Sequence, residues 1–433
     1  MDGLAACQHA MGLEAAVAAP ANPGAGSSRY DHNGTPVWRF EITRNLSLPA
    51  LYGEGDPRAA DAFGAILDEY QPDILHLHAL TSAVSVLLLA QAKRRGYPII
   101  FNFHTPTASC ARGTLRLFGE EVCDGKLYRH RCTACNLQAH GTPRALANAI
   151  SYEPAFVRQG LQATGLERGI WTAFRMPELI DIRIGAFASF MGMSDRVVAL
   201  CNWTRELLLR NGIPESKMAL CRQGISWLPQ EFPALSSCPA STTPLRTIFL
   251  GRMDETKGPH LLVEALRRNP KLPLTIDLFG VRQGQSGNSY AEKLRAMIGD
   301  DSRIRLLPPV SSSEVIARIQ EYDAILVPSQ WLETGPLVVL EAFAARTPVI
   351  GSDLGGIAEL VTDGLNGFLV SPYNSAEAWG TALRRICDQP SLLDALRAGI
   401  QPPRHTRDAA RELMPVYEGL VKEAIVKREA VTR

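Results

Sequence analysis

The chain has 433 residues, of which 46% are hydrophobic and 21% charged, the balance of an ordinary globular protein. This composition excludes a mostly disordered chain, a collagen and a coiled-coil rod, and the length predicts two or three domains. Lys and Arg number 45 and Asp and Glu 44, so the formal net charge is only +1. A charge that small gives no overall field to attract nucleic acid or an anionic membrane, and we expect no nucleic-acid partner.

No targeting segment is expected from the first 20 residues, because they lack a basic region before an apolar run. The longest strongly apolar stretch, residues 83–92, is about half of the roughly 20 residues that a membrane-spanning helix needs. The nine cysteines are odd in number and mostly dispersed, which argues against a secreted disulfide framework. We therefore expect a cytoplasmic protein, and peripheral contact with the inner face of a membrane stays open.

The first half of the chain predicts an irregular α/β domain. A helix is expected over 4–10 and a strand over 15–19, followed by buried strands over 73–77 and 99–103 around a helix over 82–95. Two further strands, over 197–201 and 218–222, flank a helix over 204–211. Between them, residues 105–187 form a cysteine-bearing insertion with some helix. The predicted N-terminal domain, residues 1–235, is therefore Rossmann-like and carries this insertion.

The second half alternates regularly between short apolar runs and amphipathic stretches. The apolar runs predict strands over 245–250, 274–279, 304–307, 324–327, 348–351 and 368–370. The amphipathic stretches predict helices over 259–268, 290–298, 314–320, 337–345, 357–361 and 376–387. Strands that are apolar on both faces are typical of a parallel, doubly wound sheet with helices on each side.

The expected architecture is α/β, with two facing Rossmann-like domains and a substrate cleft between them. A small, polar, proline-punctuated stretch over 236–244 predicts the linker, and the C-terminal domain then covers 245–405. Residues 406–433 predict an amphipathic helix, and the family resemblance given below implies that it packs back on the N-terminal domain. Membrane attachment is the alternative for this helix, and the acidic residues interspersed along it favour packing.

The sharpest motif is PSQWLETGPLVVLEAFA, residues 328–344, in which seven residues separate Glu333 from Glu341. Glu333 lies in the loop after a strand, and Gly335-Pro336 opens the helix that carries Glu341. The helix N-terminus favours anionic groups of a ligand. The carboxylates accept hydrogen bonds from hydroxyls, so a polyhydroxylated ligand such as a sugar or ribose suits them. The alternative is that both glutamates are solvated surface charges, but the apolar flanks of Glu341 argue for a partner or a function.

Two weaker motifs surround this one. Arg252 and Lys257 follow a strand in FLGRMDETKGPHLLVEAL, and two cations beside a helix N-terminus fit a diphosphate. Gly355-Gly356, in GSDLGGIAELVTDGLNGFLV, permits close backbone approach to a ligand. Each of these motifs is unspecific alone.

In this order and spacing, the three motifs resemble the retaining glycosyltransferases of family 4, the glycosyl transferases group 1. The resemblance covers residues 195–385 well and 60–110 fairly. It implies the GT-B fold, in which the C-terminal domain binds a nucleotide-sugar donor and the N-terminal domain binds the acceptor. The segment YPIIFNFHTP resembles the family's strand that ends in a histidine, here His104.

The resemblance also implies roles for single residues. Glu333 would hydrogen-bond the donor sugar, Glu341 the ribose, and Arg252 and Lys257 would neutralise the departing diphosphate. His104 would face the donor sugar from the other domain, whereas His76 and His78 are treated as structural or acceptor-side residues. Further donor-binding residues would be Thr334, Gly335, Pro336, Gly355 and Gly356.

The implied reaction is a front-face substitution with retained anomeric configuration, from a nucleotide-diphosphate sugar to a glycan or lipid-linked acceptor of envelope polysaccharide or glycoconjugate synthesis. No Asp-x-Asp motif is seen in the expected place, so no catalytic metal is expected. A sugar-nucleotide epimerase or hydrolase is a second enzyme class, against which the cation and glutamate set argues. A catalytically degenerate GT-B partner or nucleotide-sugar-binding protein is the non-enzymatic alternative, because no strand and Gly-rich turn precede the 4–10 helix.

Four cysteines cluster in the insertion: Cys110, Cys123, Cys132 and Cys135, with the spacing C-x12-C-x8-C-x2-C. Thiolates at this density in a reducing compartment predict a structural zinc site. Buried or free thiols and a redox pair are the alternatives. His130 and His140 lie nearby in sequence.

Overall fold

The computed structural model describes residues 2–152, 169–228, 231–235, 244–281 and 284–432. The chain divides into two compact units, one of Met1–Arg222 with Ala410–Arg433 and one of Gln223–Ala409. Most of the linker predicted over 236–244 lies outside the described residues, as does the 153–168 part of the predicted insertion.

The second unit is built on a parallel sheet whose strand order is β12-β11-β10-β13-β14-β15. The strands have the apolar composition of a sheet covered on both faces. They lie within one or two residues of the predicted runs, which confirms the predicted doubly wound sheet. Their bounds are β10 (Leu245–Arg252), β11 (Leu274–Val281), β12 (Ile304–Leu307), β13 (Ala324–Val327), β14 (Val349–Ser352) and β15 (Gly367–Val370).

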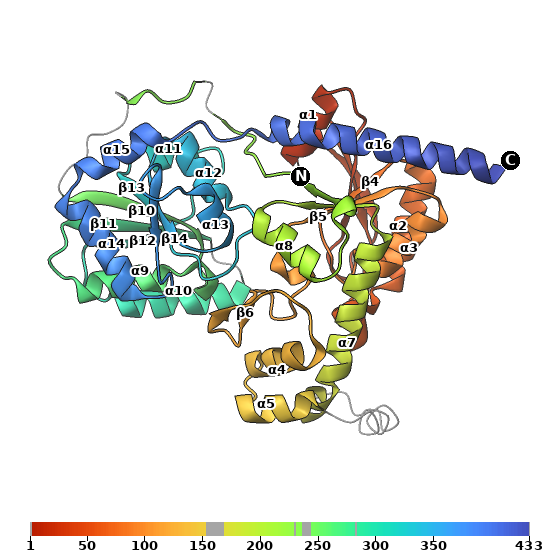
Figure 1. The fold of residues 1–433 in the computed structure, drawn as a ribbon, viewed down its shortest axis with the longest axis horizontal. Coiled ribbons are helices and arrows are strands. Elements are labelled where there is room, and N and C mark those ends of the chain that lie inside the picture. Colours follow the sequence, from red (N-terminus) through yellow and green to blue (C-terminus); the bar gives the residue numbers. More distant parts are fainter. Residues whose placement is uncertain (1, 153–168, 229–230, 236–243, 282–283, 433) are drawn as a thin grey trace. The chain divides into compact units, whose positions relative to one another are not determined.

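Helices cover both faces of this sheet, as Figure 1 shows. Along β10, Ile248 points into one apolar core and its neighbour Phe249 into the other, the period-two alternation of a strand. The Phe249 core is closed by α9 (Pro259–Arg268), α10 (Gly284–Ile298) and α14 (Ala376–Asp388). The Ile248 core is closed by α11 (Val315–Gln320), α12 (Leu337–Ala344) and α13 (Gly355–Leu360). Helix α15 (Ser391–Gly399) follows α14.

The first unit contains a four-stranded parallel sheet in the order β4-β5-β8-β9. Its central strand β5 is wholly buried. The bounds are β4 (Leu75–Leu77), β5 (Ile99–Phe103), β8 (Arg196–Ala199) and β9 (Met218–Leu220), with α2 (Pro57–Tyr70), α3 (Val86–Arg94) and α8 (Asn202–Arg210) between strands. Helix α16 (Thr406–Thr432) belongs to this unit from Ala410 onward, and its Tyr417 hydroxyl bonds both Gln8 of α1 (Asp2–Ala10) and His76.

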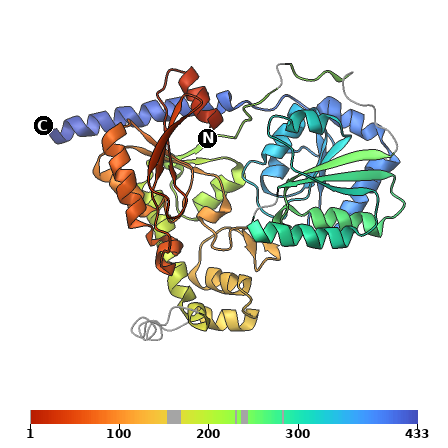
Figure 2. The same ribbon diagram turned by 180° about the vertical axis from the view of Figure 1, so that it is seen from behind.

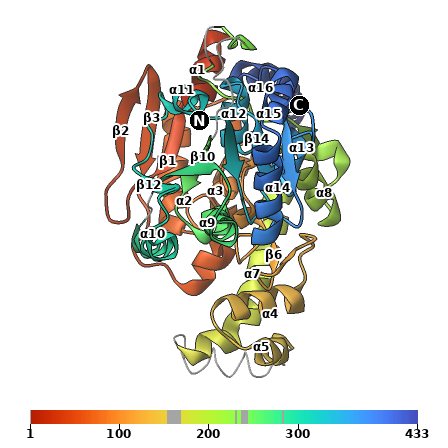
Figure 3. The same cartoon turned by 90° about the vertical axis from the view of Figure 1, so that its left-hand side faces the viewer.

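A separate three-stranded sheet precedes the four-stranded one in the chain. It consists of β1 (Val17–Pro20), β2 (Ser28–His32) and β3 (Thr35–Phe40), in the order β1-β3-β2, and is drawn in dark red in Figure 2 and labelled in Figure 3. The hairpin of β2 and β3 was not predicted. Its turn is Asn33-Gly34, and both residues have positive φ, at 54° and 79°, as a type I′ turn requires. β1 and β4 each lie at the edge of their own sheet.

The predicted insertion is a small helical subdomain with a two-stranded ribbon. The ribbon pairs β6 (Arg116–Leu117) with β7 (Glu121–Val122), and the helices are α4 (Arg129–Ala139), α5 (Arg144–Ser151) and α7 (Ile170–Met193). Short helices within the described residues include η1 (Ala50–Glu54), η2 (Pro106–Ala108), η3 (Glu215–Lys217) and η5 (Glu255–Lys257). Across the described part of the chain, no helix combines the length and the apolar character needed to cross a bilayer.

Candidate functional site

The predicted donor residues lie where the connections of the parallel sheet change direction. From β10 the chain builds β11 and β12 on one side, and it then returns to place β13 on the other side of β10. At such a switch point the loops after two neighbouring strands diverge and leave a crevice beyond their carboxyl ends, where ligands bind in open α/β sheets. Arg252 ends β10, and the loop with Glu333 follows β13.

Lys257 and Glu333 form an ion pair across this switch point. The Lys257 ammonium donates to Oε1 of Glu333 at 2.5 Å, and the Ser329 hydroxyl donates to the same oxygen at 2.7 Å. The Glu333 side chain is 9% exposed and that of Lys257 20%. The Asp254 carboxylate accepts from the Lys257 amide at 3.1 Å, which caps the turn that presents the lysine. The structure therefore brings these two predicted residues together.

Trp331 lies between the two predicted cations, and the sequence analysis did not single it out. The Arg252 guanidinium carbon is 5.7 Å from the centre of the Trp331 ring, and the Lys257 nitrogen is 5.5 Å from it. Both are within the range of cation–π attraction. The Trp331 indole N–H is buried and finds no acceptor among the described residues. Arg252 also pairs with the Asp254 carboxylate at 3.3 Å, so both cations have carboxylate partners at the carboxyl end of β10 and β13. An anionic, oxygen-rich ligand would compete for these cations and accept from the unused indole donor.

Three glycines permit the close packing of the site loops. A Cβ on Gly258, where φ is +72°, would lie 2.0 Å from the carbonyl oxygen of Pro328. A Cβ on Gly356 would lie 2.6 Å from the carbonyl oxygen of Glu333, which accepts from the Gly356 amide at 2.7 Å. Gly355 has φ of +53° and also packs against the Glu333 loop. Both glycines of the Gly355-Gly356 pair therefore pack against the loop that carries Glu333, and their approach to a ligand stays a prediction.

The segment that opens the second unit packs on the same region. Thr334 is buried, and a Cβ on Gly335 would lie 2.6 Å from the Gln223 side-chain oxygen. Pro336 is the N-cap residue of α12, one position before the first-turn place that was predicted for it. The contact between Gln223 and Gly335 joins residues more than 100 positions apart, so no local sequence pattern predicts it.

Glu341 lies in the second turn of α12, on a mostly apolar helix. Burial raises the pKa of its carboxyl from the ordinary 4.5 to about 7, although a hydrogen bond with the Trp227 side chain lowers it in part. Its sequence neighbour Leu340 shares a small buried cluster with Ile225 and Ala344. A carboxyl held in this setting at an energetic cost is typical of a functional group. Trp227 was also missed by the sequence analysis.

In the first unit, three histidines form a chain at the carboxyl ends of β4 and β5. The imidazoles of His78 and His104 share a hydrogen bond of 2.8 Å, and His76 bonds the Asn102 side chain at 2.9 Å and Tyr417 at 2.8 Å. Burial lowers the pKa of His76 and of His104 to about 4. His104 is therefore neutral at pH 7, with its ring positioned by His78.

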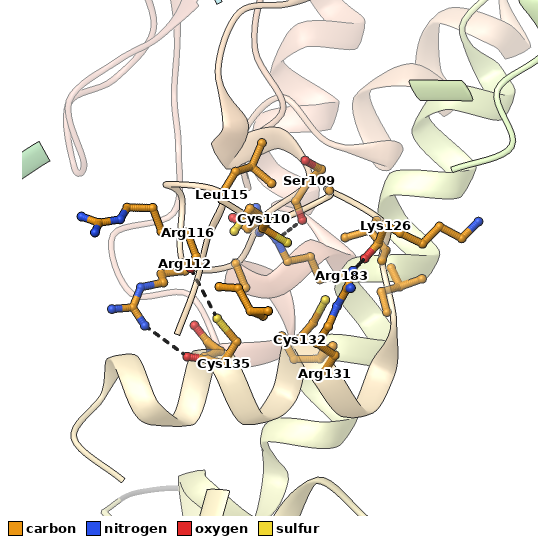
Figure 4. Close-up of a pocket in the computed structure, with 18 residues that line it drawn as sticks. Ser109, Cys110, Arg112, Leu115, Arg116, Lys126, Arg131, Cys132, Cys135 and Arg183 are labelled. Carbon is orange, nitrogen blue, oxygen red and sulfur yellow. Dashed lines mark hydrogen bonds between the residues drawn. The ribbon is translucent and has the colours of Figure 1, made fainter. Parts of the chain in front are cut away.

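The four predicted zinc ligands line one cavity in the insertion, and Cys110, Cys132 and Cys135 are labelled in Figure 4. His130 does not take part, because its Nδ1 lies 2.7 Å from the Ser151 carbonyl oxygen and its ring stacks on Tyr152. Among the described residues, no three His, Cys, Asp or Glu side chains are already arranged to hold a metal ion. The structural zinc stays a prediction.

Two family models match the sequence. Residues 237–401 match the family described as glycosyl transferases group 1, and residues 1–145 match the glycosyl transferase 4-like domain. The matched segments contain the predicted donor residues and His104, respectively.

Curated relatives match over part of their length. The D-inositol 3-phosphate glycosyltransferase of Corynebacterium kroppenstedtii is 31% identical over 189 residues, which are 40% of this chain and 40% of the relative. The protein of the same description from Corynebacterium glutamicum is 35% identical over 194 residues, 42% of this chain and 45% of the relative. The match thus spans about two fifths of the length of these relatives.

Solved structures with the same fold include the sucrose-phosphate synthase of Thermosynechococcus elongatus, with a TM-score of 0.59, 17% identity and coverage of 99% of this chain and 92% of the other. The Anabaena HepE protein in complex with UDP and glucose has a TM-score of 0.55 and 14% identity, with coverage of 89% and 86%. At these identities the likeness is one of fold, and it supports the predicted GT-B architecture of two Rossmann-like domains.

Proposed function

We propose that this chain, which belongs to the glycosyl transferases group 1, transfers a sugar from a nucleoside-diphosphate sugar to a hydroxyl acceptor. The observation that carries the proposal is the cluster of Arg252, Lys257 and Glu333 at the switch point of the second unit. It places two cations and a buried carboxylate where a doubly wound sheet binds ligands.

The three charged groups suit different parts of one donor molecule. Arg252 and Lys257 would bind the diphosphate and stabilise the negative charge that develops on it as the glycosidic bond breaks. Glu333, held by Lys257 and Ser329, has acceptor capacity for hydroxyls of the transferred sugar. Glu341 would accept from the ribose hydroxyls, since its carboxylate is positioned by Trp227 on the helix that follows.

We further propose that transfer retains the anomeric configuration and needs no metal ion. The two cations can balance the charge of the leaving diphosphate, and a phosphate oxygen of the donor can take the acceptor proton on the same face of the sugar. Neutral His104 would contribute a hydrogen bond rather than a charge, because its pKa is lowered to about 4. The structure of the HepE protein with UDP and glucose supports a uridine nucleotide as the first donor to test.

The acceptor is proposed as a glycan, a lipid-linked sugar or a phosphorylated polyol. The first two follow from the family resemblance, and the third from the relatives described as D-inositol 3-phosphate glycosyltransferases. Envelope polysaccharide or glycoconjugate synthesis is the process in which the first two would arise.

The test is release of nucleoside diphosphate from UDP-, GDP- and ADP-sugars, with each acceptor class and with EDTA present. One donor should be turned over, and Lys257→Ala should lower kcat by about 10²–10³-fold, the usual effect of removing one stabilising donor. Glu292→Gln, an exposed change on α10, is the matched control and should leave the rate unchanged. Anomeric NMR of the product tests retention. A folded protein that binds a donor without turnover would instead support a nucleotide-sugar-binding partner.

A further inference from the structure

The cavity lined by Cys110, Cys123, Cys132 and Cys135 is the most unusual feature outside the donor site (Figure 4). The cysteines come from three pieces of chain: the loop after η2, the end of the β6–β7 ribbon, and the first turns of α4. The space between them is about 30 Å³, enough for one or two water-sized groups and far too small for a sugar.

Cationic side chains predominate in the lining of this cavity, and Asp124, which pairs with Arg131, lies beside it. Five cationic side chains line it, and no acidic residue stands among its described lining residues; the cations are Arg112, Arg116, Lys126, Arg131 and Arg183. The buried Nε–H groups of Arg116 and Arg131 find no acceptor among the described residues. Part of this charge is already balanced, because the Arg131 guanidinium pairs with the Asp124 carboxylate and Arg183 donates to backbone carbonyl oxygens. The buried donors that keep no acceptor would gain from an anionic centre in the cavity.

The thiols take part in hydrogen bonds of both directions. The Phe118 amide donates to the Cys135 sulfur at 3.2 Å, whereas the Cys135 thiol donates to the Arg116 carbonyl oxygen at 3.7 Å and the Cys123 thiol to the Asp124 carboxylate at 3.8 Å. Amide donors directed at sulfur stabilise thiolates in metal centres, where such outer contacts orient the ligands.

We propose that Cys110, Cys123, Cys132 and Cys135 bind one Zn²⁺ as a structural tetrathiolate site. A zinc ion with four thiolates is net negative, and the cationic lining of the cavity would stabilise that charge. The described residues contain no group of three such side chains that is preformed to hold a metal ion. Binding of zinc would therefore require the thiols to rotate about χ1 into the cavity.

The proposed ion would join the three pieces of chain into one rigid insertion. Arg183 of α7 already holds this region, since it donates to the carbonyl oxygens of Ser109 and Cys110 at 3.3 and 3.4 Å. Cys110 lies six residues after His104, so the ion would also fix the loop that leaves β5 beside that histidine. The site would thus be structural, like closed four-ligand zinc sites elsewhere.

The test is the metal content of the full chain, purified under reducing conditions and measured by inductively coupled plasma mass spectrometry. The wild type should carry about one zinc ion per chain. Cys132→Ser should lower this content by about tenfold or more. Cys387→Ser removes a thiol of similar burial in the other unit and should change nothing.

Two further measurements use the wild type, so they do not depend on folding of a variant. Replacement of the metal with Co²⁺ should give the intense visible absorption of tetrahedral cobalt thiolate, and its absence would overturn the proposal. Intact-mass analysis should show all nine thiols reduced, whereas paired mass loss confined to these four cysteines would assign disulfides instead. None of these readouts involves a sugar donor, so their failure is distinct from failure of the proposed transferase activity.

Discussion

The ionised carboxylate of Glu341 lowers the stability of the folded protein, and a single substitution should remove this free-energy cost. Its pKa is raised from 4.5 to about 7, chiefly by burial. Each pH unit of this interval corresponds to about 1.36 kcal/mol, so ionisation of Glu341 above pH 7 costs the folded state roughly 3 kcal/mol. Glu341→Gln keeps the shape and removes the charge, and it should therefore stabilise the ligand-free protein at pH 8.

The sign of the pH dependence follows from the direction of the shift. Because the folded pKa is the higher one, the contribution of Glu341 to stability is fully present below pH 4.5 and is lost as the pH rises to about 7. The gain from Glu341→Gln should thus be near zero at pH 4.5, grow up to pH 7 and stay constant above it. At pH 8 it corresponds to a rise in Tm of roughly 6–12 °C for a domain of this size.

Thermal unfolding of both forms between pH 4.5 and 8.5 is the assay, with Glu292→Gln as the exposed control on α10. The control should follow the wild type at every pH. The reasoning would be refuted if Glu341→Gln were no more stable than the wild type at pH 8, or if its gain were the same at pH 5 and pH 8.

Three other predictions concern the ion pair, the loop packing and the histidine chain. Lys257→Met should destabilise the protein by about 3 kcal/mol, because it leaves the Glu333 carboxylate buried without its cation. In a double-mutant cycle measured by urea unfolding, Glu333→Gln should recover part of this loss. Simple additivity of the two effects would contradict the pairing. Gly258→Ala should lower Tm more than Gly299→Ala does. Both glycines have positive φ, but only a Cβ at position 258 would meet a backbone oxygen. Equal decreases in Tm would show that this contact is relieved. The pKa of His104 is depressed to about 4, so its contribution to folding stability is present above pH 6.5 and is lost as the pH falls towards 4. His104→Gln should therefore remove about one proton from the pH dependence of the free energy of unfolding in this range. An unchanged pH dependence would place the histidine charged in the folded state.

The sequence predicted the second unit well because its signals are local. Apolar runs bounded by glycine and proline mark strands whose two faces are both covered, and β12 and β13 match their predicted runs residue for residue. Gly335-Pro336 likewise marked the start of α12. The hairpin of β2 and β3 also had a local signal, the Asn33-Gly34 turn, and could have been found from it.

The partners of the site residues could not be predicted in the same way. Trp227 reaches Glu341 across more than 100 residues of sequence, and this contact depends on how the segment after β9 packs on α12. Trp331 stands in the predicted motif, but its place between Arg252 and Lys257 depends on the pairing of β10 with β13. The positions of Arg252 and Lys257 relative to Glu333 follow from the strand order, which periodicity alone does not give.

The proposed donor site requires that the second unit binds a nucleoside diphosphate. Isothermal titration of the full chain with UDP, GDP and ADP, in EDTA, tests this without any assumption about the acceptor. We predict that one of the three binds at a single site, that Lys257→Met and Glu341→Gln each weaken it by at least about tenfold, and that Glu292→Gln leaves it unchanged. A folded chain that binds none of the three, or that binds one equally well in all four forms, would contradict the assignment of the site.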